Sequence, residues 1–165
     1  MHNMKILNSK QTKEIKRKIE EQWGVCPEMD YVFLRSNKGK IYVVTRAVAD
    51  LPDERLRIDT LGLYFCEVMG DDNLRLSVEG AQIVGKVATK NLMELSINQM
   101  EMWARGMDVP LEDKSIRGFF ILRHDADILG CGYCKEGVIS NYVPKNRRLR
   151  EVNPTHSETT DDEEF

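Results

Sequence analysis

The chain has 165 residues, 41% of them hydrophobic and 31% charged, a balance that allows a buried core and excludes disorder throughout. Its longest uncharged apolar stretches, such as 62–66 and 118–122, are far too short to cross a bilayer, and the first residues lead into a charged segment rather than a signal sequence. We therefore expect a cytoplasmic protein that does not bind membranes and whose four cysteines are reduced thiols.

The formal net charge of -3 conceals a basic body. Residues 151–165 hold six acids and no lysine or arginine, and the rest of the chain has 24 basic against 21 acidic residues. Between residues 114 and 150 the excess is larger, with eight lysines or arginines against three acids. A local positive excess attracts polyanions. The acidic end, residues 153–165, is predicted to be a disordered tail.

A helix is predicted near the N-terminus, between Asn8, which can cap it, and Gly24, which can end it. Its apolar residues recur at four-residue spacing, which indicates one buried face: Ile15, Ile19 and Trp23. Two β-hairpins are predicted next, one from 31–35 and 41–45 and one from 62–68 and 74–78. Residues 1–75 are thus expected to form a mixed α/β domain within an α+β protein.

The second half is predicted to begin at residue 76, with one helical turn or a tight bend over 82–84. Ser96 and Gln99 form a capping box that opens a short helix through Trp103. Three β-segments then follow in quick succession: 118–123, 128–134 and 138–143. Glycines inside the middle segment indicate a strongly bent meander or a small β pseudo-barrel over residues 76–152.

Two short patterns resemble reactive sites. Cys131 and Cys134 have the spacing of a zinc or redox pair, but no second ligand pair accompanies them. Small residues in a bent strand explain them better, and a redox or metal role stays open.

His124, Asp125 and Asp127 cluster in one loop, where hairpin turns use these residue types anyway. We therefore predict no catalytic and no metal site.

Motifs that hold nucleotide cofactors, metal ions or a nucleophilic serine are absent from the sequence: there is no GxGxxG loop after a strand, no Walker A sequence, no HExxH helix and no GxSxG elbow. The sequence therefore predicts a protein that uses no cofactor and is not an enzyme.

Four cations and one aromatic residue lie just beyond the last predicted strand: Tyr142, Lys145, Arg147, Arg148 and Arg150. The cations could contact phosphates and the tyrosine could stack on an exposed base. The segment could equally be a solvated surface, or it could pair with the acidic tail. The pattern alone does not choose among these three interpretations.

A family resemblance adds to this picture. Three strings in the first part of the second half carry it: 76–85, 90–96 and 102–106. Three later strings follow in the same order, namely 118–122, 129–132 and 141–148. Together they resemble the PUA-like domain at the C-terminus of RsmF-type RNA cytosine-5 methyltransferases. More faintly, the arrangement of the first half resembles the α/β domain that precedes PUA in archaeal and eukaryal ribosome-biogenesis proteins.

The resemblance implies a compact pseudo-barrel that binds structured RNA, with contacts expected by position at Lys86, Lys90, Arg105, Lys145, Arg147 and Arg148. Tyr142 and Arg150 complete the expected RNA-binding set. The 75 residues before this region are too few for the family's methyltransferase domain, and Cys26 precedes Pro27, the reverse of the family's Pro-Cys order.

We therefore expect a non-catalytic accessory factor that binds transfer or ribosomal RNA in RNA modification or ribosome biogenesis, and no DNA. Any methylation would then be the work of a partner. The alternative is an adaptor that docks on an RNA methyltransferase or an assembly factor.

Overall fold

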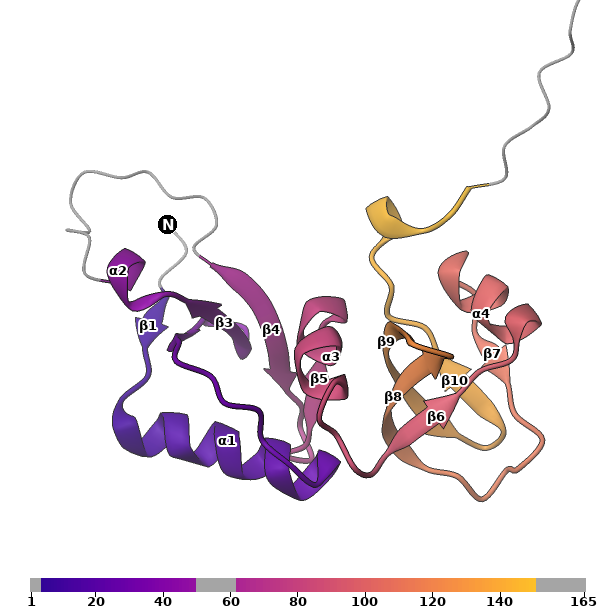
Figure 1. Cartoon of the computed structure of the whole chain (residues 1–165), viewed down its shortest axis with the longest axis horizontal. Coiled ribbons are helices and arrows are strands. Elements are labelled where there is room, and N and C mark those ends of the chain that lie inside the picture. Colours follow the sequence, from indigo (N-terminus) through magenta and orange to yellow (C-terminus); the bar gives the residue numbers. More distant parts are fainter. Residues whose placement is uncertain (1–3, 50–61, 151–165) are drawn as a thin grey trace, which may run out of the picture.

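The computed structural model describes residues 4–49 and 62–150, which form two five-stranded sheets accompanied by helices (Figure 1). The α+β class predicted from the sequence is confirmed. Within the described ranges, no helix is long and apolar enough to cross a membrane. The predicted acidic tail, residues 153–165, lies outside the described residues.

The first sheet is antiparallel and its strands follow their order in the sequence. They are β1 (Lys5–Ile6), β2 (Val32–Arg35), β3 (Lys40–Val44), β4 (Leu63–Val68) and β5 (Leu74–Leu76). A short helix, α2 (Arg46–Ala49), follows β3. Both predicted hairpins are confirmed, because β2 pairs with β3 and β4 pairs with β5. The short edge strand β1 was not predicted.

Helix α1 (Ser9–Trp23) lies against one face of the first sheet (Figure 1). The predicted cap is present, since the Asn8 side chain accepts a hydrogen bond from the backbone N–H of Gln11. Gly24 ends the helix in a left-handed conformation with φ 87°. The predicted apolar face is buried: Ile15, Ile19 and Trp23.

Helix α3 (Val78–Gly85) corrects the prediction for this region, which extended a strand to residue 78 and allowed one helical turn over 82–84. Ser77 starts the helix early because its hydroxyl oxygen accepts a hydrogen bond of 2.9 Å from the backbone N–H of Gly80. A side chain at Gly80 would overlap the carbonyl of Phe65, so glycine allows α3 to pack directly on β4.

The second sheet has the spatial order β6-β8-β9-β10-β7. Its strands are β6 (Leu92–Glu94), β7 (Val109–Pro110), β8 (Gly118–His124), β9 (Asp127–Lys135) and β10 (Val138–Ser140). Strands β8, β9 and β10 form the predicted meander, whereas β6 joins β8 in parallel. Because β6 and β7 are edge strands of an open sheet, the pseudo-barrel stays a prediction.

Helix α4 (Ile97–Ala104) begins with the predicted capping box of Ser96 and Gln99. It carries Trp103 into a second apolar cluster that also contains Leu122 of β8 and Ile139 of β10.

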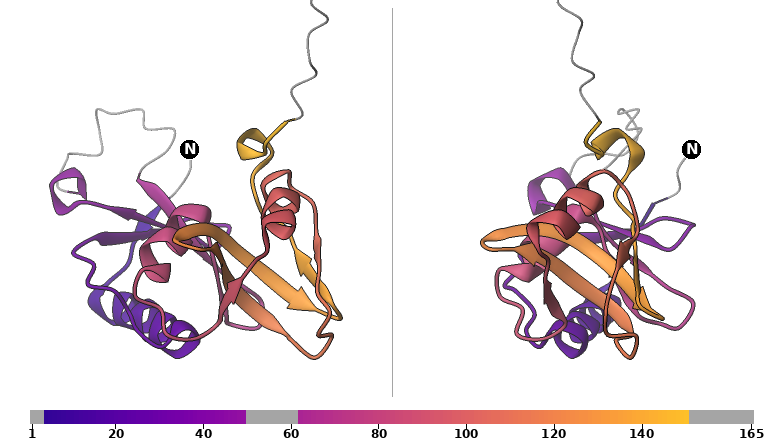
Figure 2. Two further views of the ribbon diagram at one scale, coloured as in Figure 1. Left: turned by 45° about the vertical axis from the view of Figure 1, so that its right-hand side comes forward. Right: turned by 90° about the vertical axis from the view of Figure 1, so that its right-hand side faces the viewer.

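The larger apolar cluster joins the two sheets. It contains Ile19 and Trp23 of α1, Phe65 of β4, Ile121 of β8 and Cys131 of β9. Helix α3 lies between the sheets and packs on both β4 and β9 (Figures 1 and 2). The two halves therefore share a core. The domain boundary predicted between residues 75 and 76 falls inside β5, and it stays a prediction.

Candidate functional site

The basic segment, residues 141–150, leaves β10 and runs past the end of α4. Asn141 fixes its start: the side-chain amide donates hydrogen bonds to the carbonyl oxygens of Trp103 at 2.8 Å and Met107 at 2.9 Å. The same side chain accepts from the backbone N–H of Val143 at 2.8 Å. A short 3-10 helix, η1 (Lys145–Arg147), follows. The cations of this segment thus project from an anchored backbone.

Leu149 attaches the far end of the segment to α4, and Arg148 bonds back to the start of the segment. The backbone N–H of Leu149 donates to the carbonyl of Ala104 at 2.8 Å, and Nε of Arg148 donates to the carbonyl of Val143 at 3.0 Å. Gly106, with φ 82°, lies directly beneath the Arg148 side chain, and any Cβ there would overlap it. The backbone at Gly106 therefore makes room for the arginine.

Two side chains connect the basic segment to the other half of the protein. Arg147 pairs with Glu79 in the first turn of α3. The guanidinium of Arg75 on β5 lies 4.3 Å from the ring centroid of Tyr142, a cation–π contact. Tyr142 is nevertheless 39% exposed. The segment therefore contacts α4, α3 and the first sheet at once.

The structure divides the eight residues predicted to contact RNA into two groups. One group gathers around the basic segment and the end of α4: Arg105, Tyr142, Lys145, Arg147, Arg148 and Arg150. The other group is Lys86 and Lys90, which are exposed in the connection from α3 to β6. This connection is held against the end of α1, because the backbone N–H of Thr89 donates to the carbonyl of Trp23 at 2.8 Å. In Figure 1, η1 lies above α3 and this connection runs below it.

Sequence reasoning missed three residues that shape this surface. Asn141 could have been suspected as an anchor, because asparagine after a strand commonly bonds to nearby backbone. Glu79 and Arg75 carry no such local signal, since Arg147 is 68 residues from Glu79 and Tyr142 is similarly remote from Arg75. Only the folded chain shows that these side chains meet.

The cysteine pair of β9 lies in the protein core. Cys131 and Cys134 are buried, and burial raises the pKa of Cys131 to about 12 and that of Cys134 to about 11. Reactive thiols need the opposite shift. Across residues 4–49 and 62–150, no group of three His, Cys, Asp or Glu side chains is placed to hold a metal ion.

The predicted turn at His124 is present between β8 and β9. The Nδ1 atom of His124 lies 2.7 Å from the carbonyl oxygen of Leu95, and its Nε2 atom lies 3.6 Å from the carboxylate of Asp125. Asp125 has φ 50°, as a tight turn requires.

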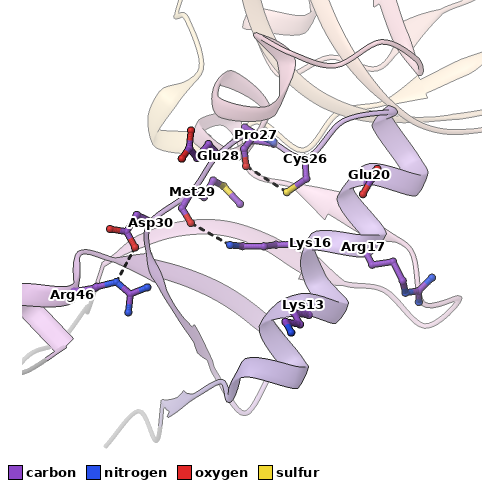
Figure 3. A pocket seen from close by; sticks show the side chains of 10 residues that line it. All are labelled: Lys13, Lys16, Arg17, Glu20, Cys26, Pro27, Glu28, Met29, Asp30 and Arg46. Carbon is purple, nitrogen blue, oxygen red and sulfur yellow. Dashed lines mark hydrogen bonds and ion pairs between the residues drawn. The ribbon is translucent and has the colours of Figure 1, made fainter.

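A groove of about 670 Å³ lies between α1 and residues 26–30 (Figure 3). Its charged side chains are largely engaged with the protein itself. Lys16 donates to the carbonyl of Met29 at 3.3 Å, and Arg46 pairs with Asp30 at 2.8 Å. Burial raises the pKa of Cys26, so this thiol is not activated. The groove therefore presents mixed, mutually compensated charge rather than a site for one class of ligand.

Comparison with known proteins identifies the second half. Residues 90–149 match the family model described as the methyltransferase RsmF PUA domain. The chain contains a PUA-like domain. A solved PUA domain from Aeropyrum pernix K1, in a tartrate complex, superposes with a TM-score of 0.51 at 12% identity. That likeness covers 85% of this chain and 75% of the other, so the shared fold extends beyond the PUA-like domain itself.

Sequence similarity also reaches into the first half. The chain is 26% identical over 137 residues to ribosomal RNA small subunit methyltransferase F of Vibrio cholerae serotype O1, in strains M66-2 and ATCC 39315. The match covers 82% of this chain but 28% of the enzyme. The PUA-like domain is thus similar to the RsmF domain, whereas the chain spans under a third of these relatives.

Proposed function

We propose that this chain is a non-catalytic RNA-binding protein that serves as an accessory factor in RNA modification or ribosome biogenesis. The observation that carries the proposal is a basic segment anchored on a PUA-like domain, with Asn141 and Leu149 bonded to α4 and Arg147 paired with α3. Structured transfer or ribosomal RNA is the proposed ligand, and a separate methyltransferase or assembly factor would supply any chemical step.

Binding would depend on charge and shape. Lys145 and Arg150 are exposed, and Arg148 is half-buried where it contacts Gly106 and Val143. Cations on an anchored backbone can match the phosphates of a folded RNA with no further cost for ordering the backbone, although their side chains still lose rotamer freedom on binding. We assign the RNA contact to the basic segment. Lys86 and Lys90 form a separate surface, which a large RNA could reach by extending around the domain.

The test is a salt-titrated binding assay against transfer RNA and ribosomal RNA fragments, with duplex DNA for comparison. The informative variant is the double reversal Lys145→Glu and Arg150→Glu, because both side chains are exposed. Arg147 and Arg148 are poorer choices, since they also hold the segment in place. The variant should bind RNA more weakly, and the slope of log affinity against log salt should fall by about one for each phosphate that the protein no longer neutralises.

A matched control is the double reversal Lys10→Glu and Lys135→Glu, which makes the same change in net charge at exposed positions on α1 and at the end of β9. Equal weakening by both variants would show that only overall charge matters and would contradict the assigned surface. No RNA binding by the unchanged protein, together with salt-insensitive capture of a methyltransferase or assembly factor, would favour the adaptor alternative.

A further inference from the structure

Aromatic rings lie side by side on the outer face of the first sheet. Tyr42 of β3 and Tyr64 of β4 are opposite each other in the ladder, with ring centroids 5.5 Å apart and planes inclined by 45°. Tyr42 stands between Ile41 and Val43, which are both buried in the core shared with α1. Because successive side chains of a strand point to opposite faces, the tyrosine pair lies on the face away from α1.

Cations accompany these rings. The Nζ atom of Lys40 lies 5.1 Å from the ring centroid of Tyr64, and Arg75 lies over Tyr142. Glu67 stands between the two cations in the ladder and pairs with Arg75 at 2.7 Å, which fixes the guanidinium plane. We call Lys40, Tyr42, Tyr64, Arg75 and Tyr142 the aromatic patch. It crosses from the first sheet to the basic segment.

A small pocket of about 70 Å³ opens within this patch where the two halves meet. The first half contributes Tyr64 and Arg75, the N-terminal turn of α3 contributes Glu79, and the basic segment contributes Tyr142 and Pro144. The aromatic patch is therefore continuous with the surface proposed to hold folded RNA, because Tyr142 precedes Lys145 by only three residues.

We propose that the aromatic patch stacks the unpaired bases of an RNA strand that continues from the folded region held by the basic segment. This inference rests on the proposed function. Flat rings beside cations suit a nucleotide strand, since bases stack on tyrosine and on guanidinium planes while the cations meet phosphates. Tyrosine is a neutral phenol at pH 7, so the rings carry no charge that would repel phosphates, and burial raises the pKa of Tyr64 further, to about 12. The two carboxylates at the patch, Glu67 and Glu79, are paired with Arg75 and Arg147, and Lys40 adds a third cation. This excess of positive charge favours an anionic strand over an acidic or apolar peptide.

The experiment compares two RNAs that share one hairpin. One ends flush, and the other carries a single-stranded extension of about four nucleotides with 2-aminopurine at one position. The extension should strengthen binding by about tenfold for each base that stacks. The 2-aminopurine fluorescence should be quenched on binding. Tyr64→Leu and Tyr142→Leu should each lose most of the gain and the quenching, whereas Tyr142→Phe should keep both because the ring remains.

The two proposals fail in different ways. If the hairpin binds equally with and without its extension, the inference is overturned and the proposed function stands. If neither RNA binds, both are overturned. Should Tyr64→Leu prove unstable in thermal melting, Lys40→Gln serves in its place and should reduce the gain from the extension while leaving hairpin binding unchanged. Unchanged extension binding in Tyr142→Leu and Lys40→Gln would also contradict stacking at this site.

Discussion

The side-chain amide of Asn141 donates a hydrogen bond of 2.8 Å to the carbonyl oxygen of Trp103, and so ties the start of the basic segment to the last turn of α4. Asn141→Ala would remove the side-chain donor to this carbonyl and to that of Met107, and the acceptor of the Val143 N–H, although the Trp103 carbonyl would still accept from the backbone N–H of Gly106 at 3.0 Å. We expect a loss of about 1–3 kcal/mol in the free energy of unfolding, measured by urea denaturation, together with weaker RNA binding. Asn146→Ala is the matched control, because Asn146 is exposed, and it should change stability by less than about 0.5 kcal/mol.

The substitutions Gly106→Ala and Gly70→Ala form a second pair of test and control. Gly106→Ala places a Cβ in the left-handed region and against Arg148, whereas Gly70 has no atom within 4 Å of the added carbon. The first substitution should cost about 1–2 kcal/mol for the backbone conformation alone, and it should also displace Arg148. The second should be nearly neutral. Thermal melting of both variants tests this, and equal melting temperatures would show that Arg148 does not depend on the glycine.

Cysteine reactivity should separate Cys26 from the other three thiols. Burial raises the pKa of Cys131 and Cys134 to about 12 and about 11 and also raises that of Cys66, so less thiolate is present at a given pH than in an unfolded chain. At pH 8.5, iodoacetamide should therefore label the half-buried Cys26 first, as mass spectrometry would show. In concentrated urea all four cysteines should react. Rapid labelling of Cys131 in the native protein would contradict its position in the core.

The two tryptophans report on the two apolar clusters, since Trp23 belongs to the shared core and Trp103 to the cluster of the second sheet. Trp23→Phe costs no hydrogen bond, because the buried Nε1 of Trp23 has no partner within the described structure, and its cost should come from the cavity left by the smaller ring. Trp103→Phe loses the bond from its Nε1 to the Leu129 carbonyl. Fluorescence of each single-tryptophan protein should follow one coincident urea transition with circular dichroism. Separate midpoints would mean that the halves unfold independently.

Local sequence signals predicted much of the fold. Asn8 and Gly24 delimited α1 because capping residues act within a few residues of the helix end. Strand-forming residues separated by turn residues predicted both hairpins. The start of α3 was wrong because Ser77 suits a strand as well as a cap, and Gly80 is explained only by the nearby carbonyl of Phe65. The parallel pairing of β6 with β8 joins segments too distant for any local pattern.

The candidate site was predictable in composition but not in arrangement. The run from Lys145 to Arg150 is visible as a charge pattern, yet its anchoring by Asn141 and its pairing with Glu79 depend on tertiary contacts. Lys86 caps the C-terminal end of α3, about 10 Å along the helix axis from Glu79 at a rise of about 1.5 Å per residue, and Lys90 lies in the connection that follows. The resemblance to the RsmF domain therefore placed Lys86 and Lys90 in one set with the basic segment, although the fold places them apart.

The core that joins the two sheets has a consequence for dissecting the chain. A fragment beginning at residue 76 would keep α3 and β9 but lose the partners of Ala81, Val84 and Cys131 on the first sheet and α1. Such a fragment would present these side chains to water as an apolar face, so it should self-associate unless another protein surface covers it. Wherever a PUA-like domain of this design stands in a longer polypeptide, the residues before it have to supply a matching apolar surface. Insertions should be better tolerated at the turns far from α3 than where the two halves join at α3.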